Sequence, residues 1–300
     1  MTDIIGSRLG DLDIPNELTD LLQRIPGITQ TELDIESDLT LAPSSDHDDT
    51  EPYVPPWATS RETTPIGSFE VEGQSFLEPL VHETPNPMIY PMCTIGIVRV
   101  SVNGKPKHRG SGVMVGPNLL LTAGHVAPWG ASNWDMEFIP AYRNGNRPFG
   151  SAWVRQYRGY NTKNNVTGHD YAICRLYTPI GNVVGWMGAR SYGKDSQYEA
   201  LTYMSSGYPG SYGERPAVEL GMRIADIDND SPGLELEFAT RKDLGPGWSG
   251  GPLWPGSTQP YVHGVLSGTE KDFLDPRRLV YAAGSPMVDL VRYGRNNWPV

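Results

Sequence analysis

The sequence predicts an all-β fold. Glycine and proline, which interrupt regular elements, are abundant: 34 glycines and 27 prolines occur among 300 residues. The apolar runs between them have the length of strands, and 15 tyrosines, 8 tryptophans and 6 phenylalanines are enough for a sizeable core. Short strands joined by loops fit this composition better than long helices.

One predicted strand leads directly to a histidine. Residues 119–122 read Leu-Leu-Leu-Thr and predict a short apolar strand, which Ala123 and Gly124 close. His125 follows, with small residues that leave room around its ring. Imidazole titrates near neutral pH and can therefore act as a general base, although a histidine after an apolar run is more often structural.

An aspartate opens a second predicted strand. Asp170 directly precedes residues 171–176, in which successive side chains face opposite sides. An aspartate at such a place is usually a turn or edge residue. When buried, it can instead fix the tautomer of a histidine and stabilise the imidazolium.

A serine lies in a glycine-rich run at residues 247–252, which read Gly-Trp-Ser-Gly-Gly-Pro. Glycines allow a sharp turn and a close approach of the backbone to a ligand. Ser249 on such a turn can present its hydroxyl group beside backbone N–H groups, as an acyl-transfer nucleophile and its oxyanion hole require. Taken alone, the run could equally be a tight turn between strands.

The three segments together, in the order His, Asp, Ser, resemble those of the chymotrypsin-like serine proteases of the trypsin superfamily. Asp170 follows His125 by 45 residues, and Ser249 follows Asp170 by 79. The low cysteine count and Ala172, two residues after the aspartate, are similar to the glutamyl-endopeptidase-like branch. The resemblance covers residues 88–298.

The resemblance implies two six-stranded antiparallel β-barrels of the chymotrypsin-like type and a C-terminal helix. Ser285 and Pro286 independently favour a helix start. The expected domain boundaries place the protease domain at 88–300, with its first barrel at 88–185, its second barrel at 186–283 and the helix at 284–300.

The resemblance also implies a serine endopeptidase that acts on protein or peptide substrates. Ser249 would attack the carbonyl group, His125 would transfer the proton, and Asp170 would hold His125. The N–H groups of Gly247 and Ser249 would form the oxyanion hole, and neither a metal nor an organic cofactor is expected. A catalytically inactive binding module and an esterase or acyl transferase are the rival interpretations.

The specificity pocket follows from the same resemblance. Its floor falls six residues before Ser249, at Asp243, and its wall comprises Leu266, Ser267 and Gly268. A carboxylate on the floor favours lysine or arginine before the scissile bond. Glutamate-specific relatives carry a histidine where this chain has Leu266, so we expect a basic residue before the cut, with an acidic residue as the alternative.

Trp248 departs from the animal trypsins, which carry an aspartate beside the nucleophile. That aspartate pairs with a newly cut amino terminus and switches the zymogen on. A tryptophan cannot form this ion pair, so control of a possible zymogen falls to other contacts.

The acidic charge lies in the N-terminal segment. Residues 1–60 hold 13 acidic and 2 basic side chains, whereas residues 61–300 hold 22 of each. We expect residues 1–65 to form a solvated, poorly ordered extension and 66–87 to connect it to the protease domain. The extension is a candidate propeptide, inhibitor or docking segment for a regulatory partner.

Two parts of this extension have distinct patterns. Residues 15–25 carry leucine and isoleucine at helical spacing and predict a short amphipathic helix. Residues 42–65 are rich in Ser, Asp, Thr and Pro and predict a linker.

Composition limits the remaining possibilities. Two cysteines, Cys93 and Cys174, cannot support a disulfide framework, so we expect two buried free thiols, with a single bridge as the alternative. No basic stripe indicates nucleic acid, and no apolar run approaches the roughly 18 residues of a membrane span. The first residues lack the pattern of a signal peptide, which favours the cytoplasm.

Overall fold

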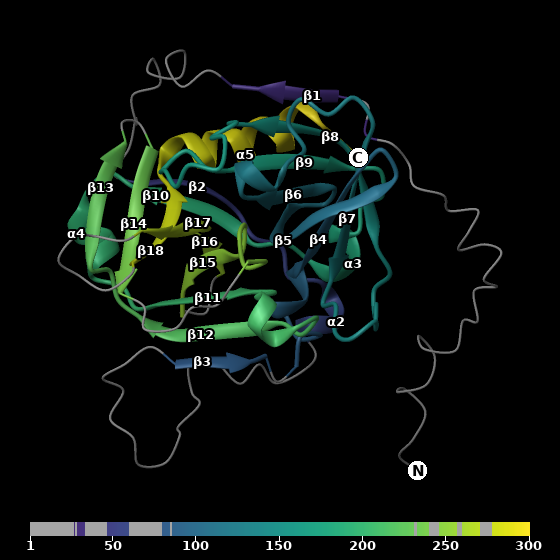
Figure 1. Cartoon of the computed structure of the whole chain (residues 1–300). Helices are drawn as coiled ribbons and strands as arrows, with labels where there is room; N and C mark the ends of the chain where they lie inside the picture. The colour runs from purple at the N-terminus through teal and green to yellow at the C-terminus, as the bar shows by residue number, and fades with distance from the viewer. Residues whose placement is uncertain are drawn as a thin grey trace, which may run out of the picture.

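The computed structural model describes residues 27, 29–33, 47–59, 80–84, 86–230, 233–239, 246–256, 260–270 and 278–300. Two β-sheet bodies lie side by side, and the C-terminal helix α5 (Ser285–Asn297) packs across them (Figure 1). Within these ranges, no helix has both the length and the apolar character needed to span a membrane.

The first body is a closed six-stranded barrel with the strand order β8-β7-β4-β5-β6-β9, which pairing of β8 with β9 closes. Asn103 and Gly104, both at positive φ, form the two-residue turn between β4 and β5, as expected for a tight hairpin. Its strands are β4 (Ile95–Val102), β5 (Lys105–Gly116), β6 (Leu119–Thr122), β7 (Trp134–Pro140), β8 (Ala152–Gly159) and β9 (Ala172–Leu176).

The second body is an eight-stranded antiparallel sheet with the order β13-β14-β18-β17-β15-β11-β12-β3. The strands are β3 (Leu80–Glu83), β11 (Tyr203–Gly207), β12 (Ala217–Met222), β13 (Asp226–Asp230), β14 (Gly233–Ala239), β15 (Pro252–Pro255), β17 (Gly264–Glu270) and β18 (Arg278–Ala283). A separate three-stranded sheet contains β16 (Tyr261–Val262), β10 (Gly188–Tyr192) and β2 (His47–Thr50). The predicted fold class, a chymotrypsin-like all-β architecture with a C-terminal helix, is confirmed. The first six-stranded barrel is closed as expected, whereas the second body is an eight-stranded antiparallel sheet where a second six-stranded barrel was expected.

Each body has its own apolar core, and a third core lies between them. The barrel encloses Val98, Leu120 and Phe138, among others, and the second sheet covers a cluster that contains Trp248 and Tyr281. The third core combines strands of both bodies with α5. This shared core fixes the two bodies relative to each other, because close-packed interiors resist sliding.

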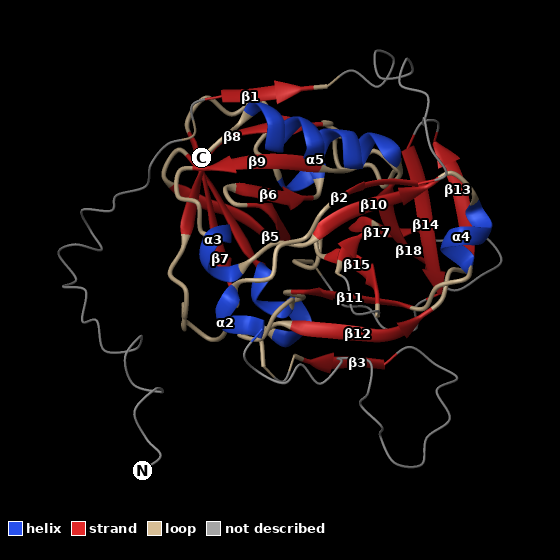
Figure 2. Ribbon diagram, turned by 180° about the vertical axis from the view of Figure 1, so that it is seen from behind, coloured by secondary structure: helices blue, strands red, loops and turns tan. Residues whose placement is uncertain are grey.

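Helix α5 confirms the predicted C-terminal helix with a small change at its start. Gly284, at φ 103°, occupies the cap position, and Ser285 is already helical, with Pro286 in the first turn. Only glycine adopts this φ readily, so Gly284 suits the turn from which the helix begins at Ser285, one residue after the predicted boundary at 284. The helix packs against β10, β2 and β9 (Figure 2).

The remaining described helices are short. They are α2 (Pro56–Thr59), α3 (Gly181–Val184), α4 (Asp195–Glu199) and the 3₁₀ turns η3 (Met92–Thr94), η4 (Gly124–Val126) and η5 (Gly210–Tyr212).

The described parts of the N-terminal segment pack on the protease body. Strand β1 (Thr29–Glu32) pairs in parallel with β8 at one side of the molecule, and β3 pairs with β12 at the opposite side (Figure 1). Strand β2 pairs with β10, where Asp49 forms an ion pair with Arg190 at 2.9 Å. The prediction of a linker over 42–65 is therefore wrong for 47–59. Residues 47–50 form a strand that pairs with β10 and residues 56–59 form a short helix, although the composition of this stretch indicated no regular structure. The helix expected at 15–25 lies outside the described residues.

Both cysteines are free and buried, so the prediction of two buried thiols is confirmed. Cys93 donates its thiol hydrogen to the carbonyl oxygen of Val184 at 3.2 Å. Burial raises the pKa of the Cys93 thiol to about 12. The thiol is consequently a structural group rather than a reactive one.

Gln30 ties β1 to the barrel. Its side chain donates to the carbonyl oxygen of Ala131 at 3.2 Å and accepts from the Gly130 N–H at 3.0 Å and from the Tyr157 hydroxyl group at 2.8 Å. We predict that Gln30→Ala lowers the free energy of unfolding by about 1–3 kcal/mol, because the partners lose their hydrogen bonds. Urea unfolding of the full chain measures this. The control Asn182→Ala alters an exposed side chain, and equal stability of the two variants would contradict the role given to Gln30.

Candidate active site

His125 lies in η4, directly after β6. Gly124 permits this position, because a Cβ atom there would lie 2.4 Å from the carbonyl oxygen of Tyr160 and 3.0 Å from Oδ1 of Asp170. The Trp129 indole N–H donates to the carbonyl oxygen of Gly124 at 2.8 Å and fixes the turn from the other side. The side chain of His125 is 21% exposed, so its ring is reachable from solvent.

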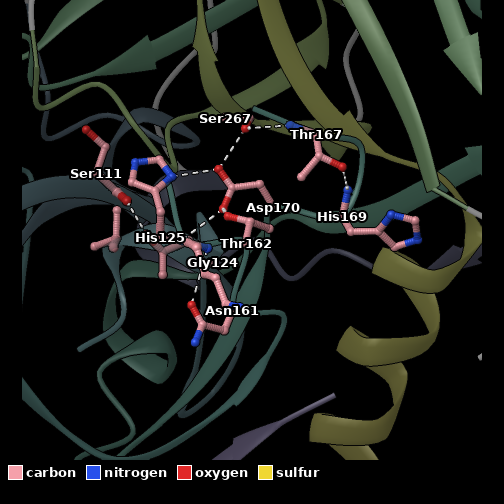
Figure 3. A network of polar contacts seen from close by, with 12 residues as sticks. Ser111, Gly124, His125, Asn161, Thr162, Thr167, His169, Asp170 and Ser267 are labelled. Carbon is pink, nitrogen blue, oxygen red and sulfur yellow. Dashed lines mark hydrogen bonds and ion pairs between the residues drawn. The ribbon is translucent and has the colours of Figure 1, made fainter. Parts of the chain in front are cut away.

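Asp170 is fully buried and accepts hydrogen bonds on both carboxylate oxygens (Figure 3). Oδ2 lies 2.6 Å from Nδ1 of His125 and accepts from the Ser267 hydroxyl group at 2.7 Å. Oδ1 accepts from the His125 backbone N–H at 2.8 Å and from the Thr162 hydroxyl group at 3.2 Å. These contacts compensate the burial of the carboxylate and place a proton on Nδ1, which leaves Nε2 of His125 as the acceptor.

The serine loop is seated against the segment that carries His125. The carbonyl oxygen of Ser249 accepts from the Ser111 N–H of β5 at 2.7 Å. A Cβ atom on Gly250, whose φ is 83°, would lie 2.7 Å from the amide nitrogen of Ala123. The Gly250 N–H donates to the carbonyl oxygen of Leu266 at 2.8 Å. The loop therefore touches both bodies, and only glycine fits at position 250.

The four residues predicted to form the specificity pocket differ in where the structure places them. Leu266 and Ser267 are buried on β17, and the hydroxyl group of Ser267 donates its hydrogen bond to Asp170 rather than to a substrate. Gly268 is half-buried beside Val166, whose Cγ2 atom would lie 2.7 Å from a Cβ atom at 268. Asp243 lies outside the described residues.

Two contacts at this site were not anticipated. Thr162 supports the carboxylate of Asp170, and Ser111 supports the serine loop from the first barrel. Ser267 was expected only in the substrate pocket. The contacts of Ser111 and Ser267 join segments distant in the sequence, whereas Thr162 precedes Asp170 by eight residues. A threonine or serine in a strand or loop carries no local pattern that reveals its partner.

A pair of carboxylates borders the loop that ends at Asp170. Asp230 and Glu235 both accept from the Gly168 N–H, at 2.9 and 3.0 Å, and Glu235 is 7% exposed. Burial, followed by the neighbouring Asp230, raises the pKa of Glu235 from 4.5 to about 8. Around neutral pH the pair holds one proton more than two free carboxyl groups would.

The fold and this geometry define a class of protein. A closed barrel and a second antiparallel sheet meet at a buried aspartate–histidine pair, and a glycine-rich serine loop lies against the histidine segment. This arrangement is chymotrypsin-like.

Comparison with known proteins narrows the class. The family model described as trypsin matches residues 96–291, about two thirds of the chain. The chain therefore belongs to the trypsin family. The glutamyl endopeptidase of Bacillus licheniformis is 34% identical over 106 residues, which amount to 33% of this chain and 32% of that protein. The chain thus matches about a third of the length of this curated relative.

Solved structures show the same fold. A glutamyl endopeptidase solved in complex with MPD has a TM-score of 0.55 and 19% identity, covering 72% of this chain and 96% of its own. The protease Anisep from Arthrobacter nicotinovorans has a TM-score of 0.52 and 21% identity, covering 68% and 93%. At these identities the likeness concerns the fold alone.

The raised pKa of Glu235 predicts a pH-dependent stability. In the folded protein Glu235 keeps its proton up to about pH 8, whereas its ordinary pKa is 4.5. The contribution of Glu235 to the free energy of unfolding is complete below its ordinary pKa of 4.5, and it is lost as the pH rises toward its folded-state pKa of about 8. Glu235→Gln cannot lose a proton, so we predict that this variant gains stability relative to the parent between pH 4.5 and 8. Urea unfolding across this range measures the difference.

The matched control is Glu199→Gln, which alters an exposed glutamate of α4. Its stability difference from the parent should stay constant across the same pH range. Parallel curves for Glu235→Gln and the parent would contradict the assignment.

Proposed function

We propose that this protein is a serine endopeptidase that cleaves peptide bonds through an acyl-enzyme. The observation that carries the proposal is the buried carboxylate of Asp170, 2.6 Å from Nδ1 of His125, beside the loop of Ser249. Because Asp170 fixes the proton on Nδ1, Nε2 is free to take the proton of the Ser249 hydroxyl group. Family membership supports the same reading.

The reaction follows from these positions. Oγ of Ser249 attacks the scissile carbonyl carbon while its proton passes to Nε2 of His125. The tetrahedral intermediate collapses, the C–N bond breaks, and the leaving amine takes the proton from His125. His125 then takes a proton from a water molecule as the water oxygen attacks the Ser249 ester, and it returns that proton to Oγ of Ser249 as the acid product leaves.

The negative oxygen of the tetrahedral intermediate requires donors that are already in place. We assign this role to the N–H groups of Gly247 and Ser249. Removal of one such donor typically costs about 2.7–4 kcal/mol in the transition state.

For specificity we propose an acidic residue before the scissile bond. Both a sequence relative and a structural relative are glutamyl endopeptidases, which favours this alternative over the basic preference suggested by Asp243. Leu266 has no hydrogen-bond donor in its side chain. The carboxylate of an acidic substrate residue would therefore have to be bound by donors from other residues of the pocket. The catalytic unit in this proposal comprises residues 88–300.

The first test concerns the nucleophile and its orienter. We predict that Ser249→Ala abolishes cleavage of peptide substrates and labelling by a fluorophosphonate. Asp170→Asn should lower kcat by about 10⁴-fold, because the asparagine favours the wrong histidine tautomer. Full labelling without peptide cleavage would favour an esterase or acyl transferase, and absence of labelling of the folded parent would favour a binding module.

The second test concerns specificity. A panel of fluorogenic peptides that differ only in the residue before the cut should show the highest kcat/KM for glutamate or aspartate. Lysine, arginine and phenylalanine supply the comparison. A preference for lysine or arginine that Asp243→Ser removes would contradict the proposal and support a carboxylate floor instead.

A further inference from the structure

Trp248, next to the serine, is anchored inside the second body. Its side chain is 1% exposed, and its indole N–H donates to Oγ of Ser205 on β11 at 3.0 Å. Two glycines make room for the ring: a Cβ atom on Gly207 or Gly251 would lie 2.7 or 2.6 Å from Cδ1 of Trp248. The indole therefore occupies a slot shaped for it, with one polar contact at its end.

The backbone on both sides of Trp248 is held in one orientation. The carbonyl oxygen of each residue from 246 to 249 accepts a hydrogen bond, all at 2.7 Å. The donors, in chain order, are the Gly210 N–H, the Ser111 hydroxyl group, the Gly251 N–H and the Ser111 N–H. In a trans peptide the N–H points opposite to the preceding carbonyl group. The bonds to Pro246 and Trp248 thus set the directions of the N–H groups of Gly247 and Ser249.

Gly247 connects the slot to the first barrel. Its φ of 110° lies in the region that only glycine adopts readily, and a Cβ atom there would lie 2.5 Å from the carbonyl oxygen of Tyr208. Ser111 bridges this corner, because its hydroxyl group donates to Gly247 and accepts from the Tyr208 N–H at 2.9 Å. A shift of the Trp248 ring would therefore displace Gly247 relative to Ser111 and Tyr208, which are hydrogen-bonded to each other.

We propose that Ser205 and Trp248 are positioning residues that hold the oxyanion hole. The hydrogen bond between them anchors the ring, and the ring holds the Trp248 backbone in place. That backbone carries the Ser249 N–H in its following peptide, and on its other side it adjoins Gly247, whose N–H direction is set by the bond from the Gly210 N–H to the Pro246 carbonyl oxygen. This tether is neutral and lies entirely within the chain, so assembly of the hole needs no ion pair. The inference rests on the proposed endopeptidase function.

The surroundings make the tether strong. Ser205, Glu219 and Tyr281 are buried around it, at 0%, 2% and 0% exposure. Burial and the neighbouring Glu219 raise the pKa of Tyr281, whose hydroxyl group therefore stays neutral. A hydrogen bond in such an interior is stronger than one in water, and a buried donor left without its acceptor is costly. Loss of the Ser205 hydroxyl group should consequently displace the indole.

The test compares Ser205→Ala with Ser206→Ala. Ser206 is the neighbouring buried serine on β11, but its hydroxyl group donates to the carbonyl oxygen of Ala217 at 2.8 Å, away from Trp248. For each variant, kcat and KM are measured on the full chain, with active sites counted by fluorophosphonate titration. A peptide aldehyde, which adds to a serine as a tetrahedral hemiacetal, reports directly on the oxyanion hole.

We expect Ser205→Ala to lower kcat per titrated site about 10-fold, a fraction of the effect of removing a whole donor. KM should stay within about twofold, because substrate binding does not use the donors fully before the transition state. The inhibition constant of the aldehyde should rise by the same factor by which kcat/KM falls. Ser206→Ala should leave kcat and the aldehyde constant unchanged.

A second variant, Trp248→Phe, keeps a ring in the slot but removes the N–H donor. If both residues act through one hydrogen bond, the double variant loses no more kcat than the worse single variant. Equal kcat per titrated site for Ser205→Ala and Ser206→Ala, with only the melting temperature changed, would overturn the proposal. Lack of turnover by the parent would instead refute the endopeptidase function.

Discussion

The site depends on the hydrogen bonds that the buried carboxylate of Asp170 accepts. This carboxylate lies where the two bodies meet, and it accepts from His125 and Thr162 of the first body and from Ser267 of the second. A buried carboxylate is costly unless hydrogen bonds replace water. One of those bonds, from Ser267, comes from the second body, so docking of the two bodies completes the set of hydrogen bonds on the carboxylate.

The serine loop depends on the same docking. Ser111 of the first barrel binds two carbonyl groups of the loop, while Ser205 of the second body binds the Trp248 ring. The residues to which we assign the roles of base, nucleophile and oxyanion donors therefore lie at one interface. In the trypsin pattern an ion pair with a new amino terminus performs part of this task. Here an uncharged contact between two residues of the second body takes that place in our proposal.

Local patterns in the sequence were sufficient for some features and insufficient for others. The strand before His125, the strand after Asp170 and helix α5 were predicted correctly, because each has a hydrophobic period and clear end signals. The pairing of residues 47–50 with β10 was not predicted, because His-Asp-Asp-Thr has no strand pattern and is ordered by a distant edge. The slot for Trp248 likewise requires Gly207 and Ser205 from a strand some 40 residues away.

The protonation of His125 tests the central claim most directly. Nitrogen-15 NMR of the full chain labelled at its histidine rings distinguishes the two neutral tautomers, and the His125 signals are assigned as those lost in His125→Gln. The account predicts that neutral His125 carries its proton on Nδ1, with Nε2 bare, and that Asp170→Asn moves the proton to Nε2. A parent protein whose His125 carries the proton on Nε2, or a tautomer that Asp170→Asn leaves unchanged, would contradict it.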